Sequence, residues 1–292
     1  MKAVPFVKYT SFGNNFVILD ELGGELLSEE EKSQFAHQAT NTCFGIGCDN
    51  LLVVQRSDRS TLERIAAGHP HWSSRPSSRQ ADVIFRMFEP DGSEALSCGN
   101  GLMSIARFLR DEHGVRNARI MTEVPLANPS IVRIGTDNHD AGWVDLGAAR
   151  CVPESVCQVK AESMVDQVVA QLPSLDVTVR EHDLKPYTDA LSLKVSGYLV
   201  FTGEPHVVIF PHRSFGLKTL AQAIFGGTEG PVRRRLSVGS WLVRRISSYF
   251  NQECSAWFPH GINVNFAQVI DRNVVEYRCY ERGIYRETLA CG

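Results

Sequence analysis

The chain has 292 residues, which is enough for one large domain or for two of ordinary size. Hydrophobic residues make up 43% and charged residues 22%, proportions that are typical of soluble globular proteins and argue against a disordered chain. The net charge of −3 argues against a nucleic-acid binder, and no apolar run reaches the roughly 18 residues that span a bilayer. Because no secretory signal is recognisable at the N-terminus, we expect a cytoplasmic protein without nucleic-acid or membrane partners.

Strands and helices alternate along the chain, since alternation of period 2 predicts strands and apolar residues at helical spacing predict helices. In chain order the predicted elements are a strand at 6–20, a helix at 29–38, strands at 51–55 and 83–88, a helix at 101–113, a strand at 131–135, a helix at 164–171, strands at 197–201 and 207–210, a helix at 236–250 and a strand at 274–280. The segment 56–80 is rich in Ser, Arg, Gly and Pro and is predicted to be a mobile surface insertion. This mixture predicts an α/β (α+β) fold class.

One seven-residue pattern occurs twice. Residues 83–89 read V-I-F-R-M-F-E and residues 275–281 read V-E-Y-R-C-Y-E, and both fit a half-buried strand. A glycine-containing turn follows each copy. After the turn comes a second match, which reads E-A-L-S-C-G at 94–99 and E-T-L-A-C-G at 287–292.

A third and weaker pair of matches precedes these two in the same order. Residues 13–18 read G-N-N-F-V-I and residues 203–208 read G-E-P-H-V-V. Three pairs in one order predict an internal duplication. We therefore expect two halves, 1–125 and 126–292, that are related by a pseudo-twofold axis, with the active site at the interface between them.

The eight cysteines do not form the pattern of a structural metal site. They include no C-x-x-C pair and no histidine lies at zinc-finger spacing, so we expect no structural zinc. An even number also fits a disulfide framework, but in a large chain without a secretory signal we expect reduced thiols.

Cys98 lies where a glycine-rich turn, S-C-G-N-G, enters a predicted helix. The first N–H groups of a helix lack intrahelical partners, and the helix dipole favours negative charge at this end. A cysteine in such a place can have its pKa lowered to roughly 3.5–7.5, which provides thiolate near neutral pH. The same N–H groups can hold a carboxylate.

The duplication places a second cysteine, Cys291, in an equivalent loop. Two thiols that face one substrate suit the inversion of a carbon centre, because one thiolate removes the α-proton and the other thiol returns a proton to the opposite face. The charge of the carbanion spreads into the substrate carboxylate, which helix N-termini stabilise. Such a reaction needs no pyridoxal phosphate and no metal, so we expect no cofactor.

The two cysteine loops resemble the signature loops of the diaminopimelate epimerase family. The first reads D-G-S-E-A-L-S-C-G-N-G at 91–101 and the second reads E-R-G-I-Y-R-E-T-L-A-C-G at 281–292. Supporting matches are F-G-N-N-F at 12–16, F-G-I-G-C-D-N at 44–50, G-E-P-H at 203–206 and F-P-H-G-I-N at 258–263. The resemblance implies two pseudo-symmetric halves, each a sheet wrapped around a central helix, and a two-thiol mechanism.

Carried onto this sequence, the resemblance implies roles for particular residues. It makes Cys98 and Cys291 the acid–base pair, and it gives His206 a supporting role in proton transfer. Residues of both halves would line the substrate pocket: Asn14, Asn50, Glu89, Gly99, Asn100, Glu204, Asn263, Glu281, Arg282 and Gly292. Gly99 and Asn100 would hold the α-carboxylate through backbone N–H groups. For each pocket residue the alternative is a turn or capping role.

Two positions depart from the pattern of the family. Glu89 and Glu204 stand where the family has asparagines that help hold the distal carboxylate of diaminopimelate. Two carboxylates would repel a third in a poorly solvated pocket and would attract a cation. Arg282 favours the opposite conclusion, because it could pair with a distal carboxylate, although it could equally neutralise either glutamate. Two substrates therefore stay open: diaminopimelate, and a basic amino acid such as lysine, ornithine, arginine or histidine.

The end of the chain departs as well. The family continues beyond Cys-Gly with a small hydroxyl residue, another glycine and a helix, whereas this sequence ends at Gly292. We therefore expect a truncated sequence that is weakly active or inactive. Two other functions stay open, a non-catalytic or degenerate member of the fold and a thiol–disulfide protein that uses Cys98 and Cys291 as a redox pair. A homodimer stays open too.

Overall fold

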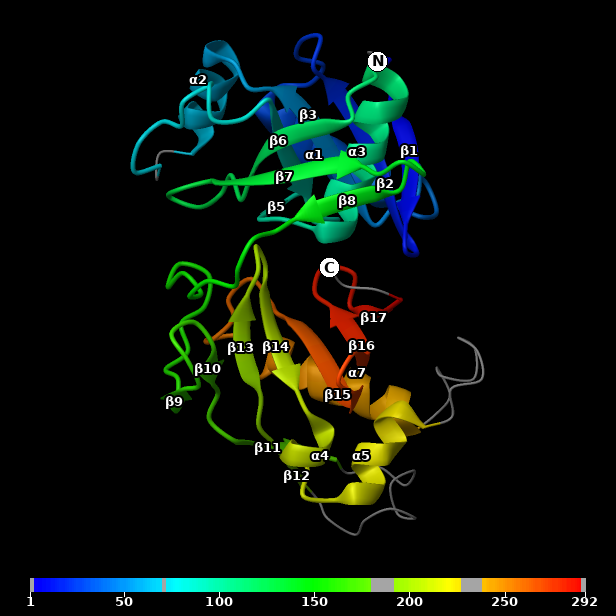
Figure 1. The fold of residues 1–292 in the computed structure, drawn as a ribbon, viewed down its shortest axis with the longest axis vertical. Coiled ribbons are helices and arrows are strands. Elements are labelled where there is room, and N and C mark those ends of the chain that lie inside the picture. The colour runs from blue at the N-terminus through cyan, green and yellow to red at the C-terminus, as the bar shows by residue number, and fades with distance from the viewer. Residues whose placement is uncertain (1–2, 70–71, 180–191, 227–237, 290–292) are drawn as a thin grey trace. The chain divides into compact units, whose positions relative to one another are not determined.

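The computed structural model describes residues 3–69, 72–179, 192–226 and 238–289. The chain divides into two compact units, Met1–Gly147 and Ala148–Cys291, and each combines helices with a mixed sheet, which confirms the predicted fold class. We expected the boundary between residues 125 and 126. The observed boundary lies later because two further strands extend the first sheet (Figure 1). No helix in the described part of the chain is long and apolar enough to cross a membrane.

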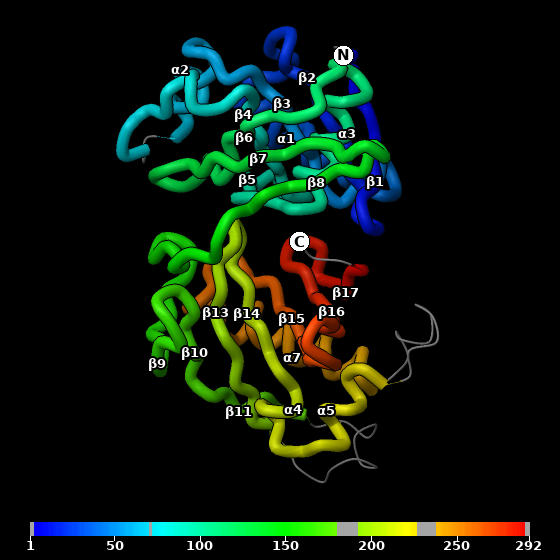
Figure 2. The backbone as a smooth tube through the Cα atoms, in the orientation of Figure 1, coloured from blue at the N-terminus to red at the C-terminus, as the bar shows by residue number. Residues whose placement is uncertain are grey.

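An eight-stranded mixed sheet is the framework of the first unit (Figure 2). Its strands are β1 (Val7–Ser11), β2 (Asn14–Glu21), β3 (Asn50–Arg56), β4 (Val83–Phe88), β5 (Glu94–Ala95), β6 (Asn117–Thr122), β7 (Ser130–Thr136) and β8 (Gly142–Asp145). They follow the order β1-β2-β3-β4-β6-β7-β8, and β5 pairs with β4 beside this path. The β2–β3 and β4–β6 pairs are parallel, and the other pairs are antiparallel.

Helices cover both faces of this sheet. α3 (Gly99–His113) buries Leu102 and its other apolar residues on one face, and α1 (Glu29–Thr40) packs on the opposite face. Successive side chains of a strand point to opposite faces, so β2 supplies both cores, Phe16 to the side of α3 and Val17 to the side of α1. Strands β2 and β3 therefore contain continuous apolar runs, as strands covered on both faces require.

The segment 56–80 contains regular structure that the sequence analysis missed. α2 (Arg59–Gly68) begins after Asp58, whose side chain caps the first turn, and it buries Ile65 in a small apolar cluster. The ring of Trp72 packs against this cluster, and its indole N–H donates to a backbone carbonyl at 2.9 Å. Part of the predicted surface insertion therefore belongs to the folded core of the first unit.

The second unit is built on a seven-stranded sheet of the order β17-β16-β15-β14-β13-β10-β9 and a separate β11–β12 hairpin. The strands are β9 (Ser163–Met164), β10 (Ala170–Gln171), β11 (Leu175–Thr178), β12 (Ser192–Val195), β13 (Tyr198–Phe201), β14 (Pro205–Ile209), β15 (Asn263–Asp271), β16 (Val274–Glu281) and β17 (Arg286–Thr288). The helices are α4 (Pro211–Ser214), α5 (Lys218–Phe225) and α7 (Val238–Gln252). α7 packs against α5 and against β15 and β16.

The helix predicted at 164–171 is wrong, because this stretch forms the β9–β10 hairpin. Its apolar residues have helical spacing, but Asp166 reverses the chain. The Asp166 carboxylate accepts hydrogen bonds at 2.7 Å from the N–H groups of Val168 and Val169. An aspartate that bonds to its own following backbone favours a turn, and β-branched valines favour strands.

The two sheets repeat one arrangement of strands. β1, β2, β3 and β4 pair antiparallel, parallel and antiparallel in turn, and β13, β14, β15 and β16 pair in the same way. The register also agrees, since Phe16 lies opposite Asn50 in one parallel pair and His206 lies opposite Asn263 in the other. The internal duplication predicted from the sequence is therefore confirmed.

Candidate active site

Cys98 occupies the N-cap of α3, at the point where the chain leaves β5 and enters the helix. Its thiol is partly buried, and its Sγ accepts a hydrogen bond from the N–H of Gly101 at 3.4 Å. Gly99 and Asn100, the first two residues of the helix, are buried. The thiol therefore lies at the positive end of the dipole of α3, an environment that favours negatively charged groups.

The loop before Cys98 is tied to the sheet. The backbone carbonyl of Leu96 accepts from the N–H of Glu123 at 2.8 Å, and the hydroxyl of Thr122 lies 3.2 Å from the same carbonyl and 3.1 Å from the Ser97 hydroxyl. All of these residues are buried. These contacts hold the two residues before Cys98 against the end of β6.

Two predicted pocket residues meet beside this loop. The Nδ2 of Asn100 donates to the Oδ1 of Asn14 at 2.7 Å, although the residues are 86 positions apart. Both side chains are buried, Asn14 at the start of β2 and Asn100 in the first turn of α3. This hydrogen bond brings the repeated segment at 13–18 to the cysteine loop.

Asn50 and Glu89 form a second buried pair in the first unit. The Nδ2 of Asn50, at the start of β3, donates to the Oε2 of Glu89 at 2.8 Å. Glu89 directly follows β4 and is 9% exposed. The pair combines a neutral amide with a carboxylate, so it carries net negative charge while Glu89 is ionised.

Arg282 contacts two other predicted pocket residues of the second unit, Glu204 and Asn263. Its guanidinium donates to the Oε2 of Glu204 at 2.7 Å and to the backbone carbonyl of His260 at 2.9 Å. Its backbone N–H donates to the Oδ1 of Asn263 at 2.9 Å. The arginine and glutamate side chains are only 14% and 10% exposed, so the pair is shielded from solvent. Of the two glutamates that Arg282 could neutralise, the structure shows it bonded to Glu204.

The remaining predicted residues of the second unit have local partners. The Nδ1 of His206 lies 2.9 Å from the amide nitrogen of Asn265, on the neighbouring strand β15. The hydroxyl of Thr288 donates to the Oε1 of Glu281 at 2.7 Å across the β16–β17 hairpin. Cys291 and Gly292 lie outside the described residues.

Two features near these residues were not predicted. Buried arginines at positions 86 and 278, inside the repeated motif, each bind a glutamate of the following strand. Cys157 is buried in the second unit, and burial raises the pKa of its thiol to about 12, with a smaller raising effect from Glu204 and a lowering effect from Arg282. The repeated arginines were visible in the sequence pattern, whereas nothing in the sequence placed Cys157 near the ion pair.

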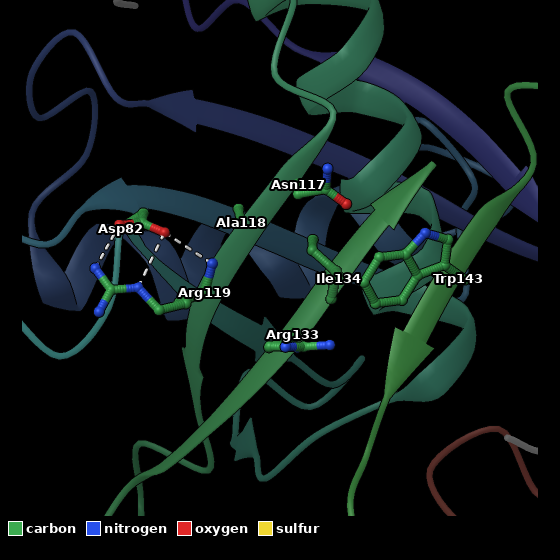
Figure 3. Close-up of a pocket in the computed structure, with 7 residues that line it drawn as sticks. All are labelled: Asp82, Asn117, Ala118, Arg119, Arg133, Ile134 and Trp143. Carbon is green, nitrogen blue, oxygen red and sulfur yellow. Dashed lines mark hydrogen bonds and ion pairs between the residues drawn. The ribbon is translucent and has the colours of Figure 1, made fainter. Parts of the chain in front are cut away.

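The described residues contain no group of three or more His, Cys, Asp or Glu side chains that could hold a metal ion. A cavity of about 390 Å³ lies on the outer strands of the first unit (Figure 3). It is lined by Asp82, Asn117, Ala118, Arg119, Arg133, Ile134 and Trp143. None of these is a predicted site residue.

Comparisons with known proteins identify the family to which this chain is similar. The family model for diaminopimelate epimerase matches residues 6–152. The diaminopimelate epimerase of Archaeoglobus fulgidus is 30% identical over 99% of this chain and 78% of its own, and that of Methanothrix thermoacetophila is 28% identical over 100% and 78%. Among solved structures, a PhzF-family phenazine biosynthesis protein of Bacillus anthracis aligns with 100% of this chain and 77% of its own, at a TM-score of 0.49 and 15% identity.

Proposed function

Since this chain belongs to the diaminopimelate epimerase family and is therefore an isomerase, we propose that it inverts the α-carbon of an amino acid through two thiols, without a cofactor. The thiols are those of Cys98 and Cys291. The observation that carries the proposal is the place of Cys98 at the N-cap of α3, within a loop that the sequence repeats around Cys291.

The chemistry follows from this arrangement. One thiolate takes the α-proton and becomes a thiol, and the electron pair of the broken C–H bond spreads into the substrate carboxylate. The other thiol gives its proton to the opposite face of the carbon and becomes the thiolate. Backbone N–H groups at the start of α3, from Gly99 and Asn100, would hold the carboxylate on which negative charge develops. The reaction leaves the enzyme with thiol and thiolate exchanged.

The first candidate substrate is LL-diaminopimelate, which would be converted to the meso form in lysine biosynthesis. Its support is the matched family and the names of the relatives. The identities of these relatives reach 30% and no more, which leaves room for a different side-chain preference on the same scaffold.

A second candidate substrate is a basic amino acid, and two contacts made by glutamates favour it. Glu204 already engages Arg282, the cation that would otherwise pair with a distal carboxylate. In the first unit Glu89 bonds to the neutral amide of Asn50, so that pair is negative when ionised. A cationic side chain suits such surroundings better than a second carboxylate does.

A substrate panel in deuterated water tests the function and separates the two candidates. LL-diaminopimelate, L-lysine, L-ornithine, L-arginine and L-histidine are incubated with the protein, α-deuterium is measured by mass spectrometry, and the new stereoisomer is measured by chiral chromatography. We expect weak but measurable exchange and inversion for diaminopimelate, and neither with Cys98→Ala or Cys291→Ala.

Each outcome assigns the function. Turnover of a basic amino acid without turnover of diaminopimelate establishes the second candidate. Exchange that survives in both cysteine variants contradicts the two-thiol mechanism. A wild-type protein that binds one of these amino acids but exchanges no α-proton is a non-catalytic member of the family.

A further inference from the structure

A buried arginine and a glutamate form the same two-point contact in both units. In the first, the Nε and Nη2 of Arg86 donate to the two carboxylate oxygens of Glu94 at 2.8 and 2.6 Å. In the second, the Nε and Nη2 of Arg278 donate to those of Glu287 at 2.6 and 2.5 Å. We call these contacts the first and second Arg–Glu forks. The two arginine side chains are 3% and 4% exposed.

The forks occupy equivalent places in the duplicated hairpin. Phe88 of β4 lies opposite Glu94 of β5, and Tyr280 of β16 lies opposite Glu287 of β17. In each unit the glutamate is the fourth residue before the cysteine, Cys98 or Cys291. The first fork therefore holds the chain where it leaves β5 and begins the loop of Cys98, and the second holds β17 at a residue that lies four positions before Cys291 in the sequence.

The surroundings of the two forks differ. Arg86 also binds Glu29 of α1, and Glu94 lies 3.1 Å from the Nε2 of His69. Arg278 instead donates to the backbone carbonyl of Ile224 at 2.5 Å and to a serine hydroxyl of α7 at 2.7 Å. The bidentate contact to the glutamate is the element that the two units share.

Stability alone is a weak reason for such a pair. Burying two charges costs desolvation energy, and replacing a buried ion pair by apolar residues of similar volume is often neutral or stabilising. A bidentate arginine–carboxylate contact supplies defined geometry instead, because two parallel hydrogen bonds fix both distance and orientation. Its occurrence in two different environments indicates that the geometry is what both loops need.

We propose that the two Arg–Glu forks are positioning devices, each of which places the cysteine of its own loop for proton transfer. The proposal rests on the two-thiol reaction proposed above. In this proposal the arginines do not touch the substrate or the thiols. Each arginine fixes the position of its glutamate, and the glutamate fixes the start of the four-residue segment that leads to the cysteine. Since a misplacement of about 1 Å can cost roughly 100-fold in rate, a fork that loosens should lower turnover without abolishing binding.

Arg86→Lys and Arg278→Lys test this proposal, because lysine keeps the charge and removes the bidentate contact. The first readout is the rate at which iodoacetamide alkylates each cysteine of the folded protein, measured by mass spectrometry. We expect Arg86→Lys to change the rate at Cys98 by about threefold, the size of a helix-end electrostatic interaction, and to leave Cys291 unchanged. Arg278→Lys should change Cys291 and leave Cys98 unchanged.

The second readout is kinetic. With a substrate that the wild type turns over, kcat should fall about tenfold or more in each variant, while KM stays within about threefold. Arg119→Lys is the matched control. Arg119 makes the same kind of contact with Asp82 at 2.8 Å on the same sheet, but both side chains are 50% exposed and neither belongs to a cysteine loop (Figure 3).

Alkylation and kcat that stay at wild-type values in both fork variants would overturn the proposal, even if the variants melt at lower temperature. Changes in alkylation rate and kcat in the control variant Arg119→Lys that are as large as those in the fork variants would overturn the proposal as well. If Arg86→Lys does not fold, Glu94→Gln, which preserves the size of the side chain, replaces it in both readouts. A wild type without turnover would refute the proposed function, and alkylation would still decide the positioning role.

Discussion

Glu94 should make the first unit sensitive to acid, and Glu94→Gln should remove much of that sensitivity. The carboxyl group is buried, which by itself would raise its pKa, but the charge and hydrogen bonds of Arg86 and a smaller contribution from His69 outweigh burial. The net effect lowers the pKa of Glu94 from 4.5 to about 2. A carboxyl group whose pKa is lower in the folded state stabilises the protein above its unfolded pKa, and this stabilisation is lost as pH falls through the folded value.

The size of this effect follows from the two pKa values. Lowering the pKa from 4.5 to about 2 corresponds to about 3 kcal/mol of stability at neutral pH. At pH 3, which lies between the two pKa values, about 2 kcal/mol of this contribution has been lost. Because a neutral amide does not titrate, the wild type should lose about 2 kcal/mol more than Glu94→Gln between pH 7 and pH 3.

Urea unfolding followed by far-UV circular dichroism at pH 7, 5, 4 and 3 measures this difference. A chain with two compact units can unfold in two transitions, so the transition of the first unit has to be identified. Ile105→Val identifies it, since this residue of α3 is fully buried and the change should cost about 1 kcal/mol in that unit alone. Parallel pH profiles for the wild type and Glu94→Gln would refute the assignment of the acid sensitivity to this carboxyl group.

Three further predictions concern the second unit and the free thiols. Gly239→Ala should destabilise the second unit by about 1–3 kcal/mol in urea unfolding, because its Cβ would lie 2.1 Å from a backbone carbonyl of α5. At pH 8 a thiol reagent should label exposed Cys43 in the native protein but label Cys157 only after unfolding, since burial raises the pKa of Cys157 to about 12; equal labelling rates would contradict this. Glu204→Gln should release Arg282 and raise the ratio of kcat/KM for diaminopimelate over lysine about tenfold, and an unchanged ratio would show that the ion pair does not select the substrate.

The sequence predicted the elements whose local pattern and tertiary surroundings agree. The strand predicted at 83–88 is β4, and the helix predicted at 101–113 is α3 with two more residues at its start. α2 was missed because its short apolar face is set among polar residues, and the capping role of Asp58 was not recognised. The hairpin at 164–171 was missed because the turn formed by Asp166 overrides an apolar spacing that fits a helix.

The candidate site was predictable at the level of residues but not of contacts. The duplication indicated Cys98 and its neighbours directly, since a cysteine that is repeated in two glycine-containing loops can be recognised from the amino-acid sequence alone. Which glutamate binds Arg282 depends on side chains that are 78 positions apart, and spacing cannot decide it. The arginines of the repeated motif were equally visible, but their function appears only when the glutamate that each one binds is seen.

The repeat also indicates which differences between the units matter. Stereoinversion requires the same kind of acid–base group on both faces of the carbon. A duplicated framework with a thiol loop in each copy therefore suits the proton transfer. Substrate recognition requires different binding residues in the two copies, because the substituents of the α-carbon differ. The copies do differ at the strand starts, where Phe16 corresponds to His206 in register and Asn14 corresponds to Glu204 in the repeated segments. Substitutions that exchange these residues between the copies should therefore alter substrate preference more than they alter the sheets, because the strand pairing around them is the same.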